Sequence, residues 1–576
     1  MASRRAGRKA LCADLVRTEF KERQQIAQQT KHVDVLVIGG GTGGTSAAWQ
    51  AATLGAKVLV IEPTPWLGGM ITSAGVSAFD GNKAAMASGF FRRLRDAIEA
   101  NYGGPQNTFT GWISETCFEP HLGARLLGEY VAQSGAEVWH GAEFVSALVD
   151  GKRVLGAVVR HKGELLEIHA RITVEATEYG DVLESAGVPY RLGRDAKSDT
   201  GEADAPEVHD LEVQDLTWCA TLKKTLPRAT SLPRPANYDP AEFDCSTAEL
   251  ATVRDEKILN HKLHSWDSFL SYSILPNDKH LLNWPFHSND SPDTIGVFGS
   301  STDRARAFEL AKQRTLRYVY YMQNDLGHPE WGLATDEYGT PDHLPTMPYM
   351  RESRRGRGVH LMLESDVVPG PGATRAPFRA DSVAIGDYYL DHHHSKAHFP
   401  PGERLEENYP DNAPFQIPFG SLIPEEWDGL LFAEKCISVS HIVNGCSRLQ
   451  PVVMLTGQAV GAIAALAVKH RIEPRQVAIA EVQSHLIGAG VALYPTLDVH
   501  NSHPAFGAIQ RLSMRGVFFE DDSMLFQPDS VIQKTAGDRW ITRWSEATGG
   551  KPDAGRSVWR DGMTKADLFV ALDAIG

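Results

Sequence analysis

The chain has 576 residues, and its 57 Lys and Arg against 72 Asp and Glu give a formal net charge of −15. Hydrophobic residues make up 42% and charged residues 22% of the chain, which is ordinary globular usage and excludes disorder over the whole length. A chain of this length has room for about two to four compact units. The acidic balance argues against a nucleic-acid-binding protein, because such proteins neutralise phosphates with basic residues.

Residues 1–31 form a polar, basic leader ahead of the first apolar run. Asp14 and Arg17 interrupt the short apolar stretch of this leader, which therefore lacks the apolar core of a secretory signal. The six cysteines form no CxxC pair, which argues against a zinc ribbon and a disulfide framework. HExxH and calcium-loop motifs are also absent from the sequence. We therefore expect a cytoplasmic protein and predict no metal site.

The next segment, residues 32–184, opens with a βαβ unit. Val33–Ile38 and Lys57–Ile61 are almost continuous apolar runs, as expected of parallel strands that are buried on both faces. Between them, a glycine-rich turn leads into an alanine-rich helix over Thr45–Leu54. Glu62 ends the second strand.

The glycine-rich turn has GxGxxG spacing at Gly39, Gly41 and Gly44, with Gly43 inside it. Gly39 allows the tight turn, Gly41 lets the backbone approach a pyrophosphate, and Gly44 lets the helix pack against the strand. The helix N-terminus offers N–H groups and its dipole to phosphates, and Glu62 is placed to accept a hydrogen bond from a ribose hydroxyl. In this strand–turn–helix context the spacing predicts a dinucleotide site. The alternative is a tight turn without a ligand.

Further strands are predicted at Ala136–Trp139, Val154–Arg160 and Leu165–Thr173. Residues 185–413 are irregular and rich in proline and aromatic residues, which predicts an inserted α+β domain that binds the substrate.

Residues 414–480 return to α/β character, with a predicted strand at Leu430–Ala433 and a long apolar helix at Pro451–Lys469. The helix contains Thr456, Gln458 and two glycines, so we expect a buried core helix and not a membrane span.

Three segments resemble flavoproteins with the glutathione-reductase-type FAD fold. Gly68-Gly69-Met70, after Glu62, resembles the double glycine that lies along FAD, and Glu175–Asp181 resembles the later ATG-type strand. Gly429–Ala467 resembles the C-terminal FAD segment of FAD-dependent oxidoreductases of the fumarate reductase and thiamine-biosynthesis type. The resemblance covers roughly residues 33–470. It implies an α/β, Rossmann-like FAD-binding domain that is split in sequence between residues 32–184 and 414–480.

The same resemblance implies which residues contact FAD. Gly457 and Gln458 would begin the last helix beside the flavin pyrimidine ring, where N–H groups stabilise negative charge on reduced flavin. His441, Asn444 and Arg448 would lie beside the isoalloxazine, on one face if the segment is helical. Asn444-Gly445 is also a turn dipeptide, so a loop remains open. The other implied cofactor contacts are Gly68, Gly69, Met70 and Thr177.

Proton-handling side chains gather in Asp381–His394, which the resemblance places close to the flavin. His392 is the first candidate for a catalytic proton acceptor, with His394, Tyr388 and His441 behind it. The alternatives are a solvated loop, or a fortuitous metal-binding surface completed by His398.

Substrate contacts are expected from the R-E-x-R-R stretch that begins at Arg351. Arg351 and Arg354 could bind a carboxylate or sugar hydroxyls, or could belong to a salt-bridged surface. Trp284 could line an aromatic substrate wall, although plain core is the commoner role of a buried tryptophan.

Residues 490–576 resemble a degenerate S-layer-homology-type helical module. The pattern predicts a small amphipathic helix pair at Ala505–Arg515 and Thr564–Leu572. We expect this module to dock on the catalytic body or to form a contact in a homo-oligomer.

Together these features predict an FAD-dependent oxidoreductase that oxidises a polar alcohol, sugar-like or amine carbon. Hydride would pass to flavin N5 while a histidine takes a proton, and the electrons would go on to oxygen or another acceptor. One alternative is a reductase of an activated C=C bond, since arginines are available for a carboxylate. Another is a non-catalytic FAD-binding scaffold or cell-surface protein.

Overall fold

The computed structural model describes residues 30–81, 87–109, 114–255, 262–394, 409–518 and 524–576. Most of the predicted leader and His398 lie outside this described part. The largest sheet has the strand order β3-β2-β1-β6-β5-β4. On the same side of β6, β5 pairs with its first half and β17 with its last residues. Its strands are β1 (Thr30–Ile38), β2 (Val58–Glu62), β3 (Glu137–His140), β4 (Ala142–Asp150), β5 (Arg153–His161), β6 (Glu164–Glu175) and β17 (Leu430–Phe432).

The centre of this sheet is parallel, as the continuous apolar runs predict. β1 pairs with β2 on one side, from Val35 opposite Val58 to Ile38 opposite Ile61, and with β6 on the other. β17 pairs with β6 in parallel, although β17 comes more than 250 residues after β6 in the chain. The two halves of the split domain therefore share one sheet. The sequence prediction of a split Rossmann-like α/β domain is confirmed.

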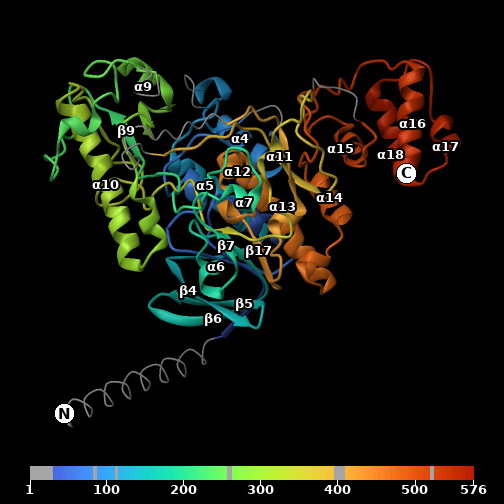
Figure 1. Cartoon of the computed structure of the whole chain (residues 1–576), viewed down its shortest axis with the longest axis horizontal. Helices are drawn as coiled ribbons and strands as arrows, with labels where there is room; N and C mark the ends of the chain where they lie inside the picture. The colour runs from blue at the N-terminus through green and yellow to red at the C-terminus, as the bar shows by residue number, and fades with distance from the viewer. Residues whose placement is uncertain (1–29, 82–86, 110–113, 256–261, 395–408, 519–523) are drawn as a thin grey trace, which may run out of the picture.

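Two helices form the layer that covers the parallel strands. α2 (Thr42–Thr53) follows the glycine-rich turn, and α13 (Gln450–His470) packs along it (Figure 1). Among the described residues, α13 is the one helix long and apolar enough to cross a membrane, and 94% of its most apolar window is buried inside the fold. This burial is the packing that the sequence predicts for a core helix.

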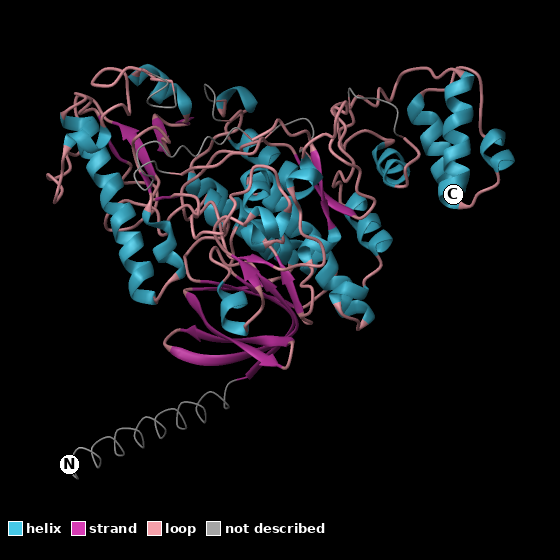
Figure 2. Ribbon diagram, in the orientation of Figure 1, coloured by secondary structure: helices cyan, strands magenta, loops and turns pink. Residues whose placement is uncertain are grey.

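Strands β4, β5 and the first half of β6 run antiparallel and extend away from the centre of the fold (Figure 2). Further helices lie around the sheet: α4 (Gly89–Asn101), α5 (Pro120–Ser134), α6 (Asp181–Ala186) and α7 (Lys197–Thr200).

A second core lies in the segment between the two halves of the split domain. A four-stranded antiparallel sheet has the order β10 (Ile274–Leu275), β11 (Lys279–Leu282), β9 (Ala220–Lys224) and β13 (Trp331–Leu333). The long helix α10 (Ser301–Asn324) begins with a capping box between Ser300 and Asp303 and packs near this sheet, as does α9 (Trp266–Tyr272). Their buried aromatic residues form a hydrophobic cluster distinct from that of the large sheet.

Among the described residues, three short antiparallel strand pairs stand apart from the two larger sheets. They are β8 (Leu216–Thr217) with β12 (Asp290–Ser291), β7 (Tyr190–Arg191) with β14 (Arg355–Gly356), and β15 (Ser382–Gly386) with β16 (Phe415–Pro418). The short helices α11 (Glu364–Val367) and α12 (His441–Ser447) contact each other, and α11 also contacts β16.

The C-terminal segment is helical, with α14 (Ile479–Gly488), α15 (Phe506–Met514), α16 (Lys534–Thr548), α17 (Pro552–Ser557) and α18 (Lys565–Ile575). The helix pair predicted for this segment corresponds to α15 and α18, and Arg511 joins them through an ion pair with Asp573. Trp540 and Phe569 pack in the core of this segment, with ring centroids 5.7 Å apart.

Candidate cofactor and active site

The glycine-rich turn lets β1, α2 and β6 approach closely. Gly39 has φ +98°, and a Cβ on it would lie 2.2 Å from the carbonyl oxygen of Ala176. A Cβ on Gly44 would lie 2.0 Å from the carbonyl oxygen of Gly39. Only glycine fits at these two positions, so the spacing in the sequence reflects the contact between strand and helix.

Glu62 lies at the carboxyl end of β2 and binds the same turn. Its two carboxylate oxygens accept hydrogen bonds from the backbone N–H groups of Gly40 at 2.7 Å and of Thr64 at 2.8 Å. Burial raises the pKa of Glu62 to about 7. This is the position at which the sequence predicts a ribose partner.

The N-terminus of α2 holds an anionic oxygen from the chain itself. Oε1 of Glu434 accepts from the backbone N–H groups of Gly43 at 2.5 Å and of Gly44 at 3.3 Å. The ammonium of Lys435 lies 3.6 Å from the other oxygen of Glu434 and pairs with Glu178. Burial, together with the charge of Glu178, raises the pKa of Glu434 to about 7. These donors therefore fit an anion such as a pyrophosphate, and the Glu434 carboxylate takes the place of one.

The double glycine packs against the glycine-rich turn. Gly68 and Gly69 have φ of +106° and +49°, and a Cβ on Gly69 would lie 2.7 Å from Cα of Gly41. The hydroxyl of Thr42 donates to the carbonyl oxygen of Gly68 at 2.7 Å, and Met70 is buried next to it. The two glycine motifs thus form one continuous backbone surface beside Glu62.

Thr177 lies just beyond the carboxyl end of β6. Its N–H donates to Glu175 at 2.6 Å, and its hydroxyl accepts from the N–H of Asp181 at 2.9 Å. These bonds close the turn between β6 and α6.

The expectation that Gly457 and Gln458 begin the last helix is wrong. α13 begins at Gln450, so both residues lie inside the helix at its contact with α2. A Cβ on Gly457 would lie 2.2 Å from the carbonyl oxygen of Gly43, and the amide of Gln458 donates to Gln50 at 2.8 Å. Close packing of two helices, not a helix terminus, explains these two residues.

The actual start of α13 lies beside a buried polar cluster. Oε1 of Gln450 accepts from the N–H of Asp80 at 3.1 Å, and its Nε2 is buried without a hydrogen-bond partner among the described residues. Burial, together with the charge of Asp391, raises the pKa of Asp80 to about 7.

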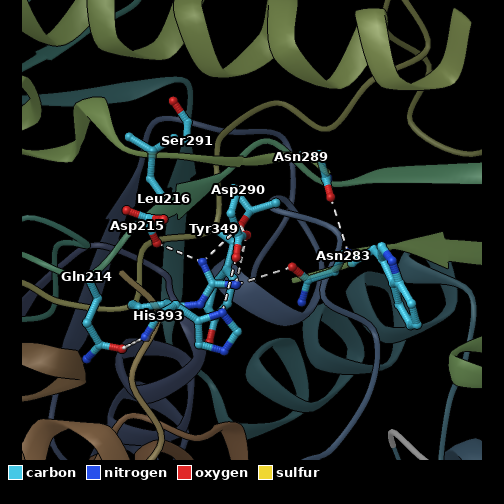
Figure 3. Close-up of polar contacts among 12 residues, drawn as sticks. Gln214, Asp215, Leu216, Asn283, Asn289, Asp290, Ser291, Tyr349 and His393 are labelled. Atoms are coloured by element: carbon cyan, nitrogen blue, oxygen red, sulfur yellow. Dashed lines mark hydrogen bonds and ion pairs between the residues drawn. The ribbon is translucent and has the colours of Figure 1, made fainter. Parts of the chain in front are cut away.

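Arg351 is the centre of this cluster, and Figure 3 labels its partners Asp215, Asn283 and Asp290. One of its terminal nitrogens donates to the carbonyl oxygen of Asp215 at 2.7 Å and to the hydroxyl of Thr217 at 2.8 Å. The other donates to Asp290 at 3.2 Å and to Asn283 at 3.4 Å. Its guanidinium is buried and both terminal nitrogens bind protein oxygens, so it is not a surface salt bridge, while its Nε has no hydrogen-bond partner among the described residues.

His393 lies between two carboxylates in the same cluster, and Figure 3 labels it together with one of them, Asp290. Its Nδ1 is 3.1 Å from Asp290 Oδ2, and its Nε2 is 3.3 Å from Asp391 Oδ2. Burial and the Arg351 charge favour the neutral ring, but the two carboxylates outweigh them and raise the pKa of His393. Although burial opposes it, the neighbouring cationic groups hold the pKa of both aspartates below the ordinary range.

Arg448 connects this cluster to α12 and α13. It donates to the hydroxyl of Tyr349 at 2.6 Å and to the carboxylate of Asp391 at 2.7 Å. The ring of Tyr349 also lies under Arg351, with the guanidinium carbon 4.8 Å from the ring centroid.

Three of the four predicted catalytic residues meet in a neighbouring group of rings. Nε2 of His394 and Nε2 of His441 are 3.3 Å apart, and Nε2 of His392 is 3.0 Å from the carbonyl oxygen of Ile442. Burial lowers the pKa of His392 and of His394 well below the usual value. The fourth residue, Tyr388, donates from its hydroxyl to Tyr389 at 3.1 Å.

The other predicted site residues have structural contacts. Arg354 donates to the carbonyl oxygens of Tyr179 and Phe298, which ties together two segments. Trp284 is fully buried and donates from its indole to the carbonyl oxygen of Ser246, so it belongs to the second core. Asn444 lies within α12, so this segment is a helix and not a loop. The side-chain oxygen of Asn444 accepts from the amide of Gln214 at 2.8 Å.

Several residues described in these clusters were not predicted from the sequence, among them Asp80, Asp290, Tyr349, Asp391, His393, Glu434 and Gln450. The triple histidine signals the region, but it does not show which ring faces the carboxylates. Asp290 is about one hundred residues from His393 and carries no motif.

Comparisons with known proteins agree with this geometry. Residues 34–486 match a family model described as FAD dependent oxidoreductase. A digeranylgeranylglycerophospholipid reductase of Thermoplasma acidophilum is 30% identical over 160 residues, which are 25% of this chain and 38% of the relative. A thiamine thiazole synthase of Aeropyrum pernix is 32% identical over 131 residues, which are 22% of this chain and 45% of the relative. The chain thus spans less than half the length of these curated relatives.

Solved structures with similar chain paths include a geranylgeranyl bacteriochlorophyll reductase-like protein from Thermoplasma acidophilum. Its TM-score is 0.32 at 10% identity, over 90% of this chain and 97% of the other. Thermovibrio ammonificans THI4 has a TM-score of 0.23 at 16% identity, over 35% of this chain and 82% of the other. The family match ends at residue 486, and the S-layer-homology resemblance of the tail stays a prediction. Because the family model covers most of the chain, the chain belongs to the FAD-dependent oxidoreductase family.

Proposed function

We propose that this oxidoreductase oxidises a small polar molecule at a C–H bond, with His393 as the proton acceptor. The bound flavin supplies the hydride acceptor. The glycine-rich turn, the double glycine and Glu62 would hold the dinucleotide, and the start of α13, with Arg448 and Asp80, would hold the flavin end. The polar cluster centred on Arg351 orients the substrate at that end.

The position of His393 between Asp290 and Asp391 is the observation that carries this proposal. A general base must gain a positive charge when it accepts a proton, and two carboxylates at 3.1 and 3.3 Å stabilise that charge. The substrate proton is accepted at Nε2, and the new N–H then pairs with Asp391, while Nδ1–H donates to Asp290. The carboxylate pair also fixes the ring, since each nitrogen faces one partner.

The polar character of the cluster favours a polar substrate. Arg351, Arg448 and Tyr349 are buried. Arg351 donates to Asp290, and Arg448 donates to the hydroxyl of Tyr349. A substrate that enters here meets carboxylates, guanidinium groups and phenols, which recognise hydroxyl or amino groups. A long hydrocarbon would leave these buried polar groups without partners.

A second candidate is the reduction of an activated C=C bond, which the similarity to a digeranylgeranylglycerophospholipid reductase favours. That relative matches only a quarter of this chain. The engagement of Arg351 also counts against it, since both terminal nitrogens of this guanidinium already bind protein oxygens and are poorly placed to donate a proton.

Anaerobic flavin bleaching with a panel of alcohols, sugars and amines tests the proposal. We expect one class to bleach the flavin of the holoenzyme, and His393→Gln to slow that bleaching by about 10²–10⁴-fold, as expected for loss of a general base. His470→Gln, on the exposed surface, is the matched control and should bleach at the wild-type rate.

Bleaching by His393→Gln at the wild-type rate, with FAD retained, would contradict the role of His393. Failure of the whole panel, combined with reoxidation of chemically reduced flavin by an activated alkene, would favour the reductase. A flavin that responds to neither treatment would favour the non-catalytic scaffold.

A further inference from the structure

Three histidine rings from two distant segments converge beside the start of α12. His392 and His394 follow β15 in the chain, and His441 is the first residue of α12. One ring nitrogen of each lies within 4.8 Å of those of the other two, and the Nε2 atoms of His394 and His441 are 3.3 Å apart. His392 and His441 are buried, and His394 is half-buried.

The hydrogen bonds on the outer sides of two rings determine where their lone pairs lie. Nδ1 of His441 is 3.0 Å from the carboxylate of Glu352, so it carries the proton and leaves the lone pair on Nε2. Nε2 of His392 is 3.0 Å from the carbonyl oxygen of Ile442, which can only accept, so the lone pair lies on Nδ1. That Nδ1 is buried and has no hydrogen-bond partner among the described residues.

These are the features of a histidine metal site. Zinc binds histidine nitrogen at about 2.0–2.1 Å in tetrahedral geometry, which places two such nitrogens roughly 3.3 Å apart. A carboxylate on the far nitrogen of a ligating histidine, as Glu352 is here, orients the ring and raises its basicity. We propose that His392, His394 and His441 bind a divalent transition-metal ion of the zinc class, with the fourth position open to water or a small ligand.

The surroundings can balance the added charge. Asp195 accepts from the backbone N–H of His441 at 3.0 Å, and Glu202 accepts from the hydroxyl of Ser440 at 2.6 Å. With Glu352, these carboxylates lie around the helix start that carries His441, and Arg355 pairs with Asp195 and Glu352. A cation at the three rings would lie close to this group of acids.

A comparable group elsewhere in the described structure already has its cation. Glu119, His121 and Glu337 also bring three ligand atoms together. The ammonium of Lys279, however, lies 2.7 Å from Glu119 and 2.6 Å from Glu337. A lysine therefore satisfies these carboxylates, whereas rings facing one another through neutral nitrogens are suited to a metal.

The metal would fasten the His392–His394 segment to α12. His393, between the two proposed ligands, contacts Asp290 and Asp391, and Arg448 at the end of α12 contacts Asp391. The ion would thus act as a positioning element for the polar cluster. Its binding does not depend on the proposed reaction, because the three rings are assembled without a substrate.

Metal binding to the full-length chain, prepared without a histidine tag and dialysed against a chelator, tests this site. Zinc chloride alone is the probe, titrated calorimetrically, and bound zinc is counted by elemental analysis after gel filtration. We expect one zinc per chain. His394→Gln and His392→Gln should each weaken binding at least tenfold, because a three-histidine site loses one ligand. His470→Gln, an exposed histidine, should leave binding unchanged.

Equal zinc binding by the wild type and by both ligand variants would overturn the site, as would a wild type that retains no zinc. The thermal unfolding temperature of each variant, measured without metal, shows whether it is folded. A second signature keeps the test independent of folding losses: zinc should raise the unfolding temperature of the wild type and of His470→Gln but not that of His394→Gln. If the 3.3 Å contact is only an N–H···N hydrogen bond, zinc will raise none of them.

Discussion

Glu434 is the residue whose position is most directly coupled to cofactor binding. Its carboxylate accepts from the N–H groups of Gly43 and Gly44, where a dinucleotide of this family presents its pyrophosphate. Its φ of +53° is unusual for a residue other than glycine. FAD must therefore displace this carboxylate or bind beside it, and two anions compete for the same donors.

We expect Glu434→Gln to bind FAD about tenfold more tightly than the wild type, since removal of one like charge is worth about 1.4 kcal/mol at such a position. Fluorescence quenching of FAD titrated with the apoprotein measures this. Glu426→Gln, at an exposed carboxylate, is the control and should leave the Kd unchanged. Weaker FAD binding by Glu434→Gln would show that the carboxylate supports the cofactor.

The same residue predicts a pH dependence of FAD affinity. Burial raises the pKa of free Glu434 to about 7, and a nearby pyrophosphate raises it further, so binding takes up a proton. FAD affinity should therefore fall as the pH rises above about 7. In Glu434→Gln this fall should be lost, and Glu62, whose pKa is also about 7 and whose ionised form accepts from the ribose, would act in the opposite direction. An unchanged slope would contradict this assignment.

Among the elements, the contact between α2 and α13 joins the cofactor turn to the C-terminal half of the FAD domain. A Cβ added to Gly457 would lie 2.2 Å from the carbonyl oxygen of Gly43, and a Cβ added to Gly461 would lie 2.2 Å from the carbonyl oxygen of Ala47. The small residues let the two helices pack at backbone distance.

Gly457→Ala should therefore lower the free energy of unfolding by about 1–3 kcal/mol, because the added methyl overpacks this contact. It should also weaken FAD retention, since Gly43 belongs to the dinucleotide turn. Gly128→Ala in α5 is the matched control: a Cβ there meets nothing within 4 Å, so we expect about 0.5–1 kcal/mol of stabilisation. Denaturant unfolding measures both. Equal stability of Gly457→Ala and wild type would mean that the helices can shift apart freely.

The sequence predicts these elements well where a local pattern exists. Continuous apolar runs predict β1 and β2, the glycine spacing predicts the turn, and Pro451 with the apolar run predicts α13. The assignment of Gly457 to the helix start failed because a glycine can serve either a helix terminus or a close helix contact, and spacing alone does not distinguish them.

At the scale of the whole molecule, the clusters depend on contacts between segments far apart in the chain. His393 meets Asp290 across about one hundred residues, and Glu434 meets Gly43 across 391. The three-histidine group has no sequence motif because His441 is 47 residues from His394. Such contacts follow from the pairing of β8 with β12 and of β17 with β6. The periodicity of hydrophobic residues along the sequence predicts neither pairing.

The whole-molecule account rests on FAD as the redox cofactor of this chain. The visible absorption spectrum of the purified full-length protein, recorded again after incubation with FAD and gel filtration, tests this most directly. The account predicts flavin bands that co-elute with the protein, and it predicts that acid precipitation releases the flavin if it is held without a covalent bond. A protein that shows no flavin bands even after incubation with FAD would contradict the account.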